Sequence, residues 1–269
     1  MKAFAHHFAF EFRTGIRNKI LLLMNYLLPL GFYLMMGFVI AQISPDFQQT
    51  LIPSMVVFAA MVATVLGMPD PLVRGRETGI FRSYRITGIP SISILVIPAL
   101  TTVLHLVIVS TIIAVSAPLL FDSPMPVNWL SFVMVFIAMA LSLTGISVLI
   151  AVIASSSRMV ILWSQLIFIP TMMLGGITFP IDFLPNAARQ FAQILPSTHA
   201  MNAFKWTMGQ ETAFTPWGSI TVLATSGLLA FVLAAYLFSW DSRNTERRGH
   251  PALALLVLLP FIAGIFLFT

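Results

Sequence analysis

The stretch WLSFVMVFIAMALSLTGISVLIAVIA, residues 129–154, decides the fold of this chain. It contains no Asp, Glu, Lys, Arg or Pro, and it is longer than the about 20 apolar residues that a helix needs to cross a bilayer. Its apolar residues follow one another without the alternation at period 2 that marks the strands of a membrane barrel. The stretch therefore predicts a membrane-spanning α-helix.

Apolar runs of the same kind fill most of the remaining sequence, at residues 20–41, 51–68, 89–121, 159–178, 217–240 and 252–268. Of the 269 residues, 58% are hydrophobic and 9% are charged, whereas a soluble domain carries about 25% charge. This composition excludes a cytosolic enzyme. It predicts an all-α polytopic membrane protein with a bundle of six core transmembrane helices. The last run is short and contains Pro260, so it either crosses as a seventh helix, which we favour, or is re-entrant.

The positions of the basic residues predict the orientation. All of the 14 lysines and arginines except Arg189 and Lys205 fall before the first run or in alternate loops after it. Since cytoplasmic loops retain Lys and Arg, the amino terminus is expected in the cytoplasm. The first run is too long for a signal peptide and lacks a cleavage site of small residues. With no cysteines, disulfides and thiolate metal sites are excluded.

Residues 1–19 form an amphipathic pattern before the first run. Phe4, Phe8, Phe12 and Ile16 recur at a spacing of four, and basic residues and histidines occupy the opposite side. This pattern predicts a helix that lies in the inner membrane interface, either as a plain anchor or as an elbow that guides the first span. The neighbouring histidines at positions 6 and 7 point to different faces, so no metal site is expected.

Residues 70–90 form the most highly charged loop, between the second and third runs. Apolar residues lie among its arginines, which a loop that only fixed topology would not need. We therefore predict a cytoplasmic docking element, with a simple positive-inside signal as the alternative reading. The predicted contact residues are Arg74, Arg76, Glu77, Ile80, Phe81, Arg82, Tyr84 and Arg85.

Residues 174–200, LGGITFPIDFLPNAARQFAQILPSTHA, cannot form one continuous helix, because glycines and prolines interrupt it. Pro185 suits the first turn of a short helix that ends before Pro196. We predict a segment that returns partway into the bilayer from the outer side and acts as a gate; an ordinary loop helix is the alternative. The predicted gate residues are Gly175, Gly176, Phe179, Pro180, Phe183, Leu184, Pro185, Phe191, Pro196 and His199.

These two segments resemble those of ABC-2 type transporter permeases. The resemblance rests on the glycine pair, on Leu184-Pro185 with Pro196, Thr198, His199 and Lys205 after it, and on the run 76–79, RETG. It implies a permease domain over residues 1–250, two permease copies of the same or a related chain, and a separate ATPase subunit that binds ATP and Mg and contacts the charged loop. Residues 251–269 depart from the family's usual six spans, and Ser197 and Lys205 depart from its usual residues.

The sequence itself restricts the energy source and the chemistry. The runs hold no acid or base apart from His105, and no GxxxxGK[ST] motif is present. No HExxH or GxSxG motif is present either, so we expect no catalytic site, no metal and no cofactor in this chain. Energy for uphill transport would then come from another polypeptide.

The runs also suggest the substrate class, because an uncharged, aromatic-rich lining suits an amphiphile such as a lipid, a glycolipid or a hydrophobic drug. A polysaccharide, a passive channel and a lipid-modifying enzyme remain as alternatives. Membrane lipid is an expected contact and nucleic acid is not. The resemblance and the charge pattern place the chain in the cytoplasmic membrane of a bacterium or an archaeon.

Overall fold

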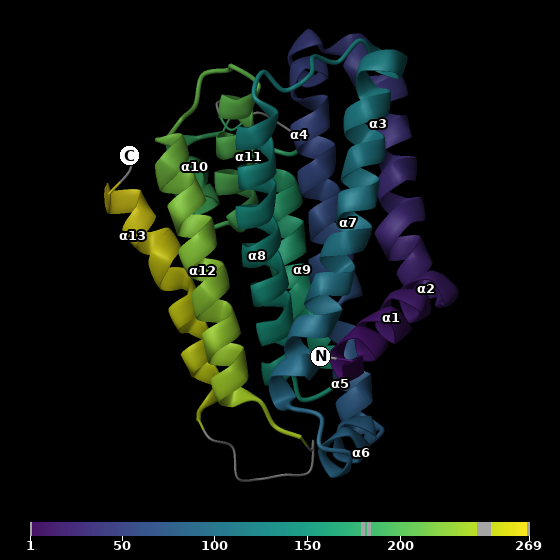
Figure 1. Cartoon of the computed structure of the whole chain (residues 1–269). Coiled ribbons are helices and arrows are strands. Elements are labelled where there is room, and N and C mark those ends of the chain that lie inside the picture. The colour runs from purple at the N-terminus through teal and green to yellow at the C-terminus, as the bar shows by residue number, and fades with distance from the viewer. Residues whose placement is uncertain (1, 179–180, 182–183, 241–248, 268–269) are drawn as a thin grey trace.

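The computed structural model describes residues 2–178, 181, 184–240 and 249–267, and every regular element in these ranges is a helix (Figure 1). Within these ranges, six helical segments are long and apolar enough to cross a membrane. The predicted all-α polytopic bundle with six core spans is therefore confirmed.

The first two spans each contain a turn of π-helix. The first joins α2 (Lys19–Leu22), η1 (Leu23–Leu27) and α3 (Leu28–Ile43), and the second joins α4 (Pro45–Met61), η2 (Val62–Gly67) and α5 (Pro69–Glu77). Residues 70–77, expected in a loop, are thus a helical extension of the second span. Pro69 lies in the first turn of α5, where a missing N–H is tolerated, so it does not end the helix.

The other four spans are unbroken helices. They are α7 (Ser91–Phe121), α8 (Trp129–Ile153), α9 (Ser157–Leu174) and α12 (Pro216–Leu237). Polar caps fix several starts: the Asn128 side chain accepts a hydrogen bond from the Ser131 N–H, and the Ser156 side chain accepts one from the Met159 N–H. The predicted boundaries of these four spans hold to within a few residues.

Shorter helices lie at the two ends of the bundle (Figure 1). We call one end the α6 end, which carries α1 (Lys2–Arg17), α5 and α6 (Ile80–Ile86). The opposite end, which we call the α10 end, carries α10 (Asn186–Ala192) and α11 (Pro196–Thr207). α1 is inclined to the long helices, and its place in the membrane interface stays a prediction.

The closest helix pair is α8 with α12, and small residues form its contact. A Cβ atom on Gly227 would lie 2.7 Å from the backbone of Leu141, and one on Gly145 would lie 2.7 Å from the Gly227 carbonyl oxygen. Beside them, the hydroxyls of Ser142 and Ser226 are 2.8 Å apart. Small residues and hydroxyl pairs of this kind let membrane helices approach closely, so α8 and α12 form a tightly joined pair.

Burial separates the interior spans from those at the rim. For each span we compare the share of its most apolar 18 residues that is buried. This share is 94% in the second span and 83% in α8, but only 28% in the first span and 17% in α9. The second span and α8 therefore form the centre of the bundle, while the first span and α9 face outward.

The C-terminal segment packs along α12. It consists of η4 (Pro251–Leu258), a 3₁₀ helix, followed by α13 (Leu259–Leu267). Its Phe261 side chain is fully buried. The segment is shorter than the six candidate spans, and a seventh membrane crossing stays a prediction.

Candidate functional site

The predicted docking element is a pair of short helices at the α6 end. Gly79, with φ of +80°, turns the chain between α5 and α6, a conformation that favours glycine. α6 then folds back so that the Phe81 ring packs on Gly75, where a Cβ atom would lie only 2.8 Å from Phe81 Cε1. The two helices therefore form one compact unit at the end of the second span.

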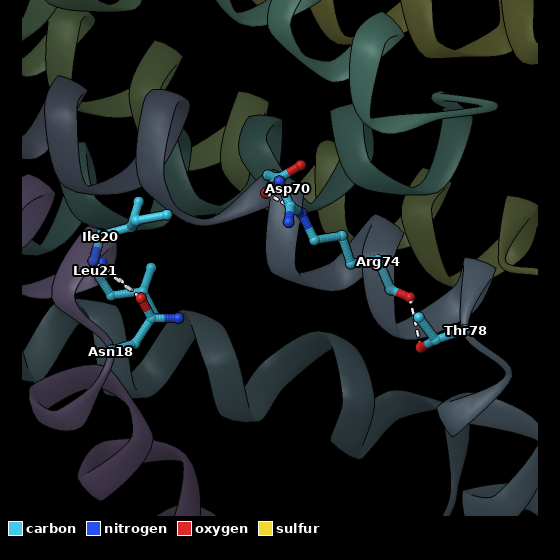
Figure 2. A network of polar contacts seen from close by, with 6 residues as sticks. All are labelled: Asn18, Ile20, Leu21, Asp70, Arg74 and Thr78. Carbon is cyan, nitrogen blue, oxygen red and sulfur yellow. Dashed lines mark hydrogen bonds and ion pairs between the residues drawn. The ribbon is translucent and has the colours of Figure 1, made fainter.

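An exposed polar network runs along α5 (Figure 2). Arg74 Nε lies 2.7 Å from Asp70 Oδ2, and the Thr78 hydroxyl donates to the Arg74 carbonyl oxygen at 2.8 Å. Figure 2 also shows Asn18, whose side chain accepts from the N–H groups at the start of α2. Arg74 is exposed, so its ion pair contributes little to stability and its side chain lies at the surface.

Two residues of the predicted contact set, Arg76 and Phe81, are buried within the chain. The Arg76 side chain is 5% exposed; Nη1 donates to the Val152 carbonyl oxygen at 2.9 Å, and Nη2 donates to the Ala154 carbonyl oxygen. These carbonyls lie at the end of α8, where no further N–H of the helix can reach them. The Phe81 ring packs against Phe238, with 6.1 Å between ring centroids.

The other predicted contact residues lie at or near the surface of this end. Glu77, Ile80, Arg82 and Arg85 are exposed, and Tyr84 is partly buried. Ile86, which the predicted contact set left out, is 86% exposed. The exposed side of α6 thus combines aliphatic and basic side chains, outside the candidate spans.

α1 also contributes to this end. Burial raises the pKa of the Tyr84 hydroxyl, and the negative charge of Glu11 in α1 raises it further. Farther along α1, the Phe12 ring stacks on His105 of α7, with centroids 4.5 Å apart. The sequence pattern predicted an amphipathic helix here, but it did not predict these contacts with α6 and α7.

The predicted gate segment begins where α9 ends, at Leu174. Gly175 is packed against Ser197, and Gly176 adopts a φ of +77°. α10 then starts directly after Pro185, as the sequence predicted. Phe179, Pro180 and Phe183 lie outside the described residues, and the re-entrant depth of the segment stays a prediction.

The chain continues from α10 into α11, a buried helix that the sequence analysis missed. Pro196 was expected only to end a helix, but it starts the next one, because proline is favoured in a first helical turn. α11 packs against α12, α8 and α4. Residues at its start, including Pro196, Thr198 and His199, are buried.

His199 joins three parts of the chain. Its Nε2 lies 2.8 Å from the Gln193 carbonyl oxygen, which can only accept, so Nε2 carries the hydrogen. Its Nδ1 is buried and has no hydrogen-bond partner among the described residues, and its ring lies 5.7 Å from that of Phe261 in α13. Burial lowers the pKa of His199 although the Gln193 carbonyl opposes this shift, so the imidazole is neutral near pH 7.

The predicted gate residues do not all meet. Gly175, Pro196 and His199 are buried, whereas Pro185 and Phe191 are exposed. Within the described residues, no three His, Cys, Asp or Glu side chains gather where they could hold a metal ion.

The family model described as ABC-2 type transporter matches residues 3–209. The chain is 22% identical over 231 residues to YvfS of Bacillus subtilis (strain 168), whose name marks it as a candidate transport permease. That alignment covers 84% of this chain and 93% of YvfS. No solved structure matches the chain significantly.

Proposed function

The chain belongs to the ABC-2 type transporter family, and from this membership we propose that it is the permease subunit of an ATP-binding cassette exporter. It is a multi-pass membrane protein and a transporter subunit rather than an enzyme. In the proposed complex, two permease copies pair in the cytoplasmic membrane with their amino termini in the cytoplasm, and ATP and Mg are bound by separate ATPase subunits.

The docking surface for the ATPase in this proposal is the exposed side of α6 with the neighbouring end of α5. Ile86 supports it most directly, because an isoleucine that is 86% exposed outside the candidate spans gains from being covered by a partner. Arg82 and Arg85 on the same short helix suit acidic groups on that partner. Glu77 adds an opposite charge beside them.

The proposed substrate is an amphiphile such as a lipid, a glycolipid or a hydrophobic drug. α9 supports this choice, because beyond Arg158 at its start the outward face carries Ile161, Leu162 and Leu166 and no further charge. Such a surface offers an apolar molecule contact but gives an ion or a charged sugar no specific partner. The gate of the proposed exporter is the segment from Gly175 to His199.

The test is to reconstitute the chain in liposomes with and without an ATPase subunit encoded beside it. We expect no ATP hydrolysis by the chain alone, and ATP-dependent export of a fluorescent phospholipid by the complex. Hydrolysis by the isolated chain would contradict the proposal, as would ion currents without ATP, which would indicate a channel. Export of a polysaccharide but not of the phospholipid would leave the permease role intact and overturn the proposed substrate class.

A further inference from the structure

A partly open cavity of about 330 Å³ lies at the α6 end, and residues of this single chain line it. Helices α1, α5, α6 and α7 and the two π-helical turns surround it. Its size falls at the lower end of the about 300–1,000 Å³ typical of small-molecule sites. Much of its wall is apolar, with contributions from Met68, Leu72, Ile94 and Pro98.

Irregular backbone surrounds this cavity on several sides. Asn25 lies in the π-helical turn η1, Ala63 and Gly67 lie in η2, and Pro98 interrupts the hydrogen bonding of α7. π-Helical turns occur often at functional sites, because the extra residue displaces neighbouring side chains from the regular helical pattern. Here two such turns from different spans border the same space.

Several polar groups of the wall have unused hydrogen-bonding capacity. The Asn25 side chain is 5% exposed, and in the described part of the chain neither it nor the Thr102 hydroxyl has a hydrogen-bond partner. His105 uses Nδ1 for the Tyr26 hydroxyl, at 2.6 Å, while its Nε2 is buried and has no hydrogen-bond partner in the part of the chain that the structure describes. Asn25 and Thr102 line the cavity, so their polar groups are available to a ligand that can hydrogen-bond to them.

Charge selects among possible ligands. Glu11 contributes a carboxylate to the wall, and the described lining residues include no lysine or arginine. A phosphate or carboxylate headgroup would therefore meet a like charge in the wall. An ammonium group can donate to the Glu11 carboxylate, which accepts several hydrogen bonds at once.

We propose that this cavity binds a lipophilic amine, with the hydrocarbon part among the apolar side chains and the protonated nitrogen toward Glu11. Asn25 and Thr102 provide further hydrogen bonds near the amine. This site lies inside one chain, and it requires neither an ATPase nor a second permease copy. It is therefore separate from the transport path of the proposed exporter and can be tested without it.

The absence of cysteine allows a direct test by thiol labelling. Thr102→Cys places one thiol in the cavity, and Ala235→Cys places one on an exposed part of α12 as the matched control. Each variant, in lipid nanodiscs, is labelled with uncharged methyl methanethiosulfonate in the presence of dodecylamine or dodecanol. These two probes have the same hydrocarbon chain and differ in the charge of the head. Ala63→Cys replaces Thr102→Cys if the latter does not fold.

We expect dodecylamine to slow labelling at position 102 about tenfold or more, and to leave labelling at position 235 unchanged. Dodecanol should protect about tenfold less, because its neutral hydroxyl cannot form the charge-assisted hydrogen bond to Glu11 that the ammonium group forms. Adding Glu11→Gln should remove the difference between the two probes. Equal protection by amine and alcohol, no protection by either, or a difference that survives Glu11→Gln would overturn the proposal.

Discussion

Arg76 Nη1 donates a hydrogen bond to the Val152 carbonyl oxygen at 2.9 Å, across 76 positions of the sequence. With Nη2 on the Ala154 carbonyl oxygen, the guanidinium satisfies two acceptors at the end of α8. A cation is also favoured there by the negative end of the helix dipole. The contact ties α5, beside the proposed docking surface, to the central span of the bundle.

Replacing Arg76 should therefore destabilise the protein. Arg76→Ala leaves the α8 carbonyls without their charged donor in a buried place, at a cost of about 2–4 kcal/mol. Arg74→Ala is the matched control, because that side chain is exposed and its ion pair contributes at most about 1 kcal/mol. Thermal unfolding in detergent measures both. Equal losses for the two variants would contradict a structural role for the Arg76 hydrogen bonds.

The exposed aliphatic side chain of α6 provides a test of docking. Ile86→Ser should leave the stability of the isolated chain unchanged and weaken its binding to the ATPase subunit about tenfold or more, since buried apolar contacts hold such interfaces together. Val127→Ser is the control, because Val127 is 78% exposed and its N–H donates to the Thr207 carbonyl oxygen in α11, at the α10 end. Pull-down titrations give the affinities. If Ile86→Ser binds the ATPase as tightly as the parent chain does, α6 is not the docking surface.

The α8–α12 contact should not accept a larger side chain. Gly227→Ala puts a methyl group about 2.7 Å from the Leu141 backbone, so we expect a loss of about 2–3 kcal/mol or a failure to fold. Gly31→Ala is the matched control, because it changes helix propensity in the same way while no other atom lies within 4 Å of the new methyl group. This substitution should leave the free energy of unfolding unchanged or raise it. Unfolding temperatures compare the two. A tolerated Gly227→Ala would mean that the two helices can separate at little cost.

The C-terminal segment should be an integral part of the bundle. Phe261→Ala removes a fully buried ring beside His199 and should cost about 3 kcal/mol or more. Phe266→Ala, in the same helix but 80% exposed, should have little effect. Limited proteolysis of α13 and thermal unfolding measure both effects. Similar behaviour of the two variants would show that Phe261 does not anchor the segment.

Stability should fall in acid through His199. Burial lowers the pKa of His199 in the folded state, so the unfolded state binds a proton more readily. The free energy of unfolding therefore has its full value above the unfolded-state pKa of about 6.5, and it decreases as the pH falls below that value. The loss attributable to this group reaches at most about 1.4 kcal/mol per pH unit. Unfolding of the parent chain and of His199→Gln at pH 7.5 and pH 5.0 gives the difference. A parallel loss in both proteins would assign the acid sensitivity to other groups.

The spans were predictable because uncharged runs of about 20 residues have few alternatives to a membrane helix. α11 was not, because Ser197, Thr198, His199 and Asn202 make its sequence look like a loop; only tertiary packing reveals how their side chains are accommodated. The buried position of Arg76 was equally hidden, since its carbonyl partners on α8 carry no sequence signal. Charge predicted where the docking element lies, but not which of its residues face inward.

The π-helical turn at Leu23–Leu27 has a consequence for comparing this chain with its relatives. A π turn holds about one residue more than an α turn, and the surplus is absorbed locally. A relative with one residue fewer at this place can keep both flanks of the span in their present orientation. The same deletion one turn farther along, between Leu27 and Tyr33, would rotate the rest of the helix by about 100°. It would move Tyr33 off the α7 residue Ser116, to which its hydroxyl now hydrogen-bonds at 2.8 Å. Differences in length within this family should therefore collect at the π turns.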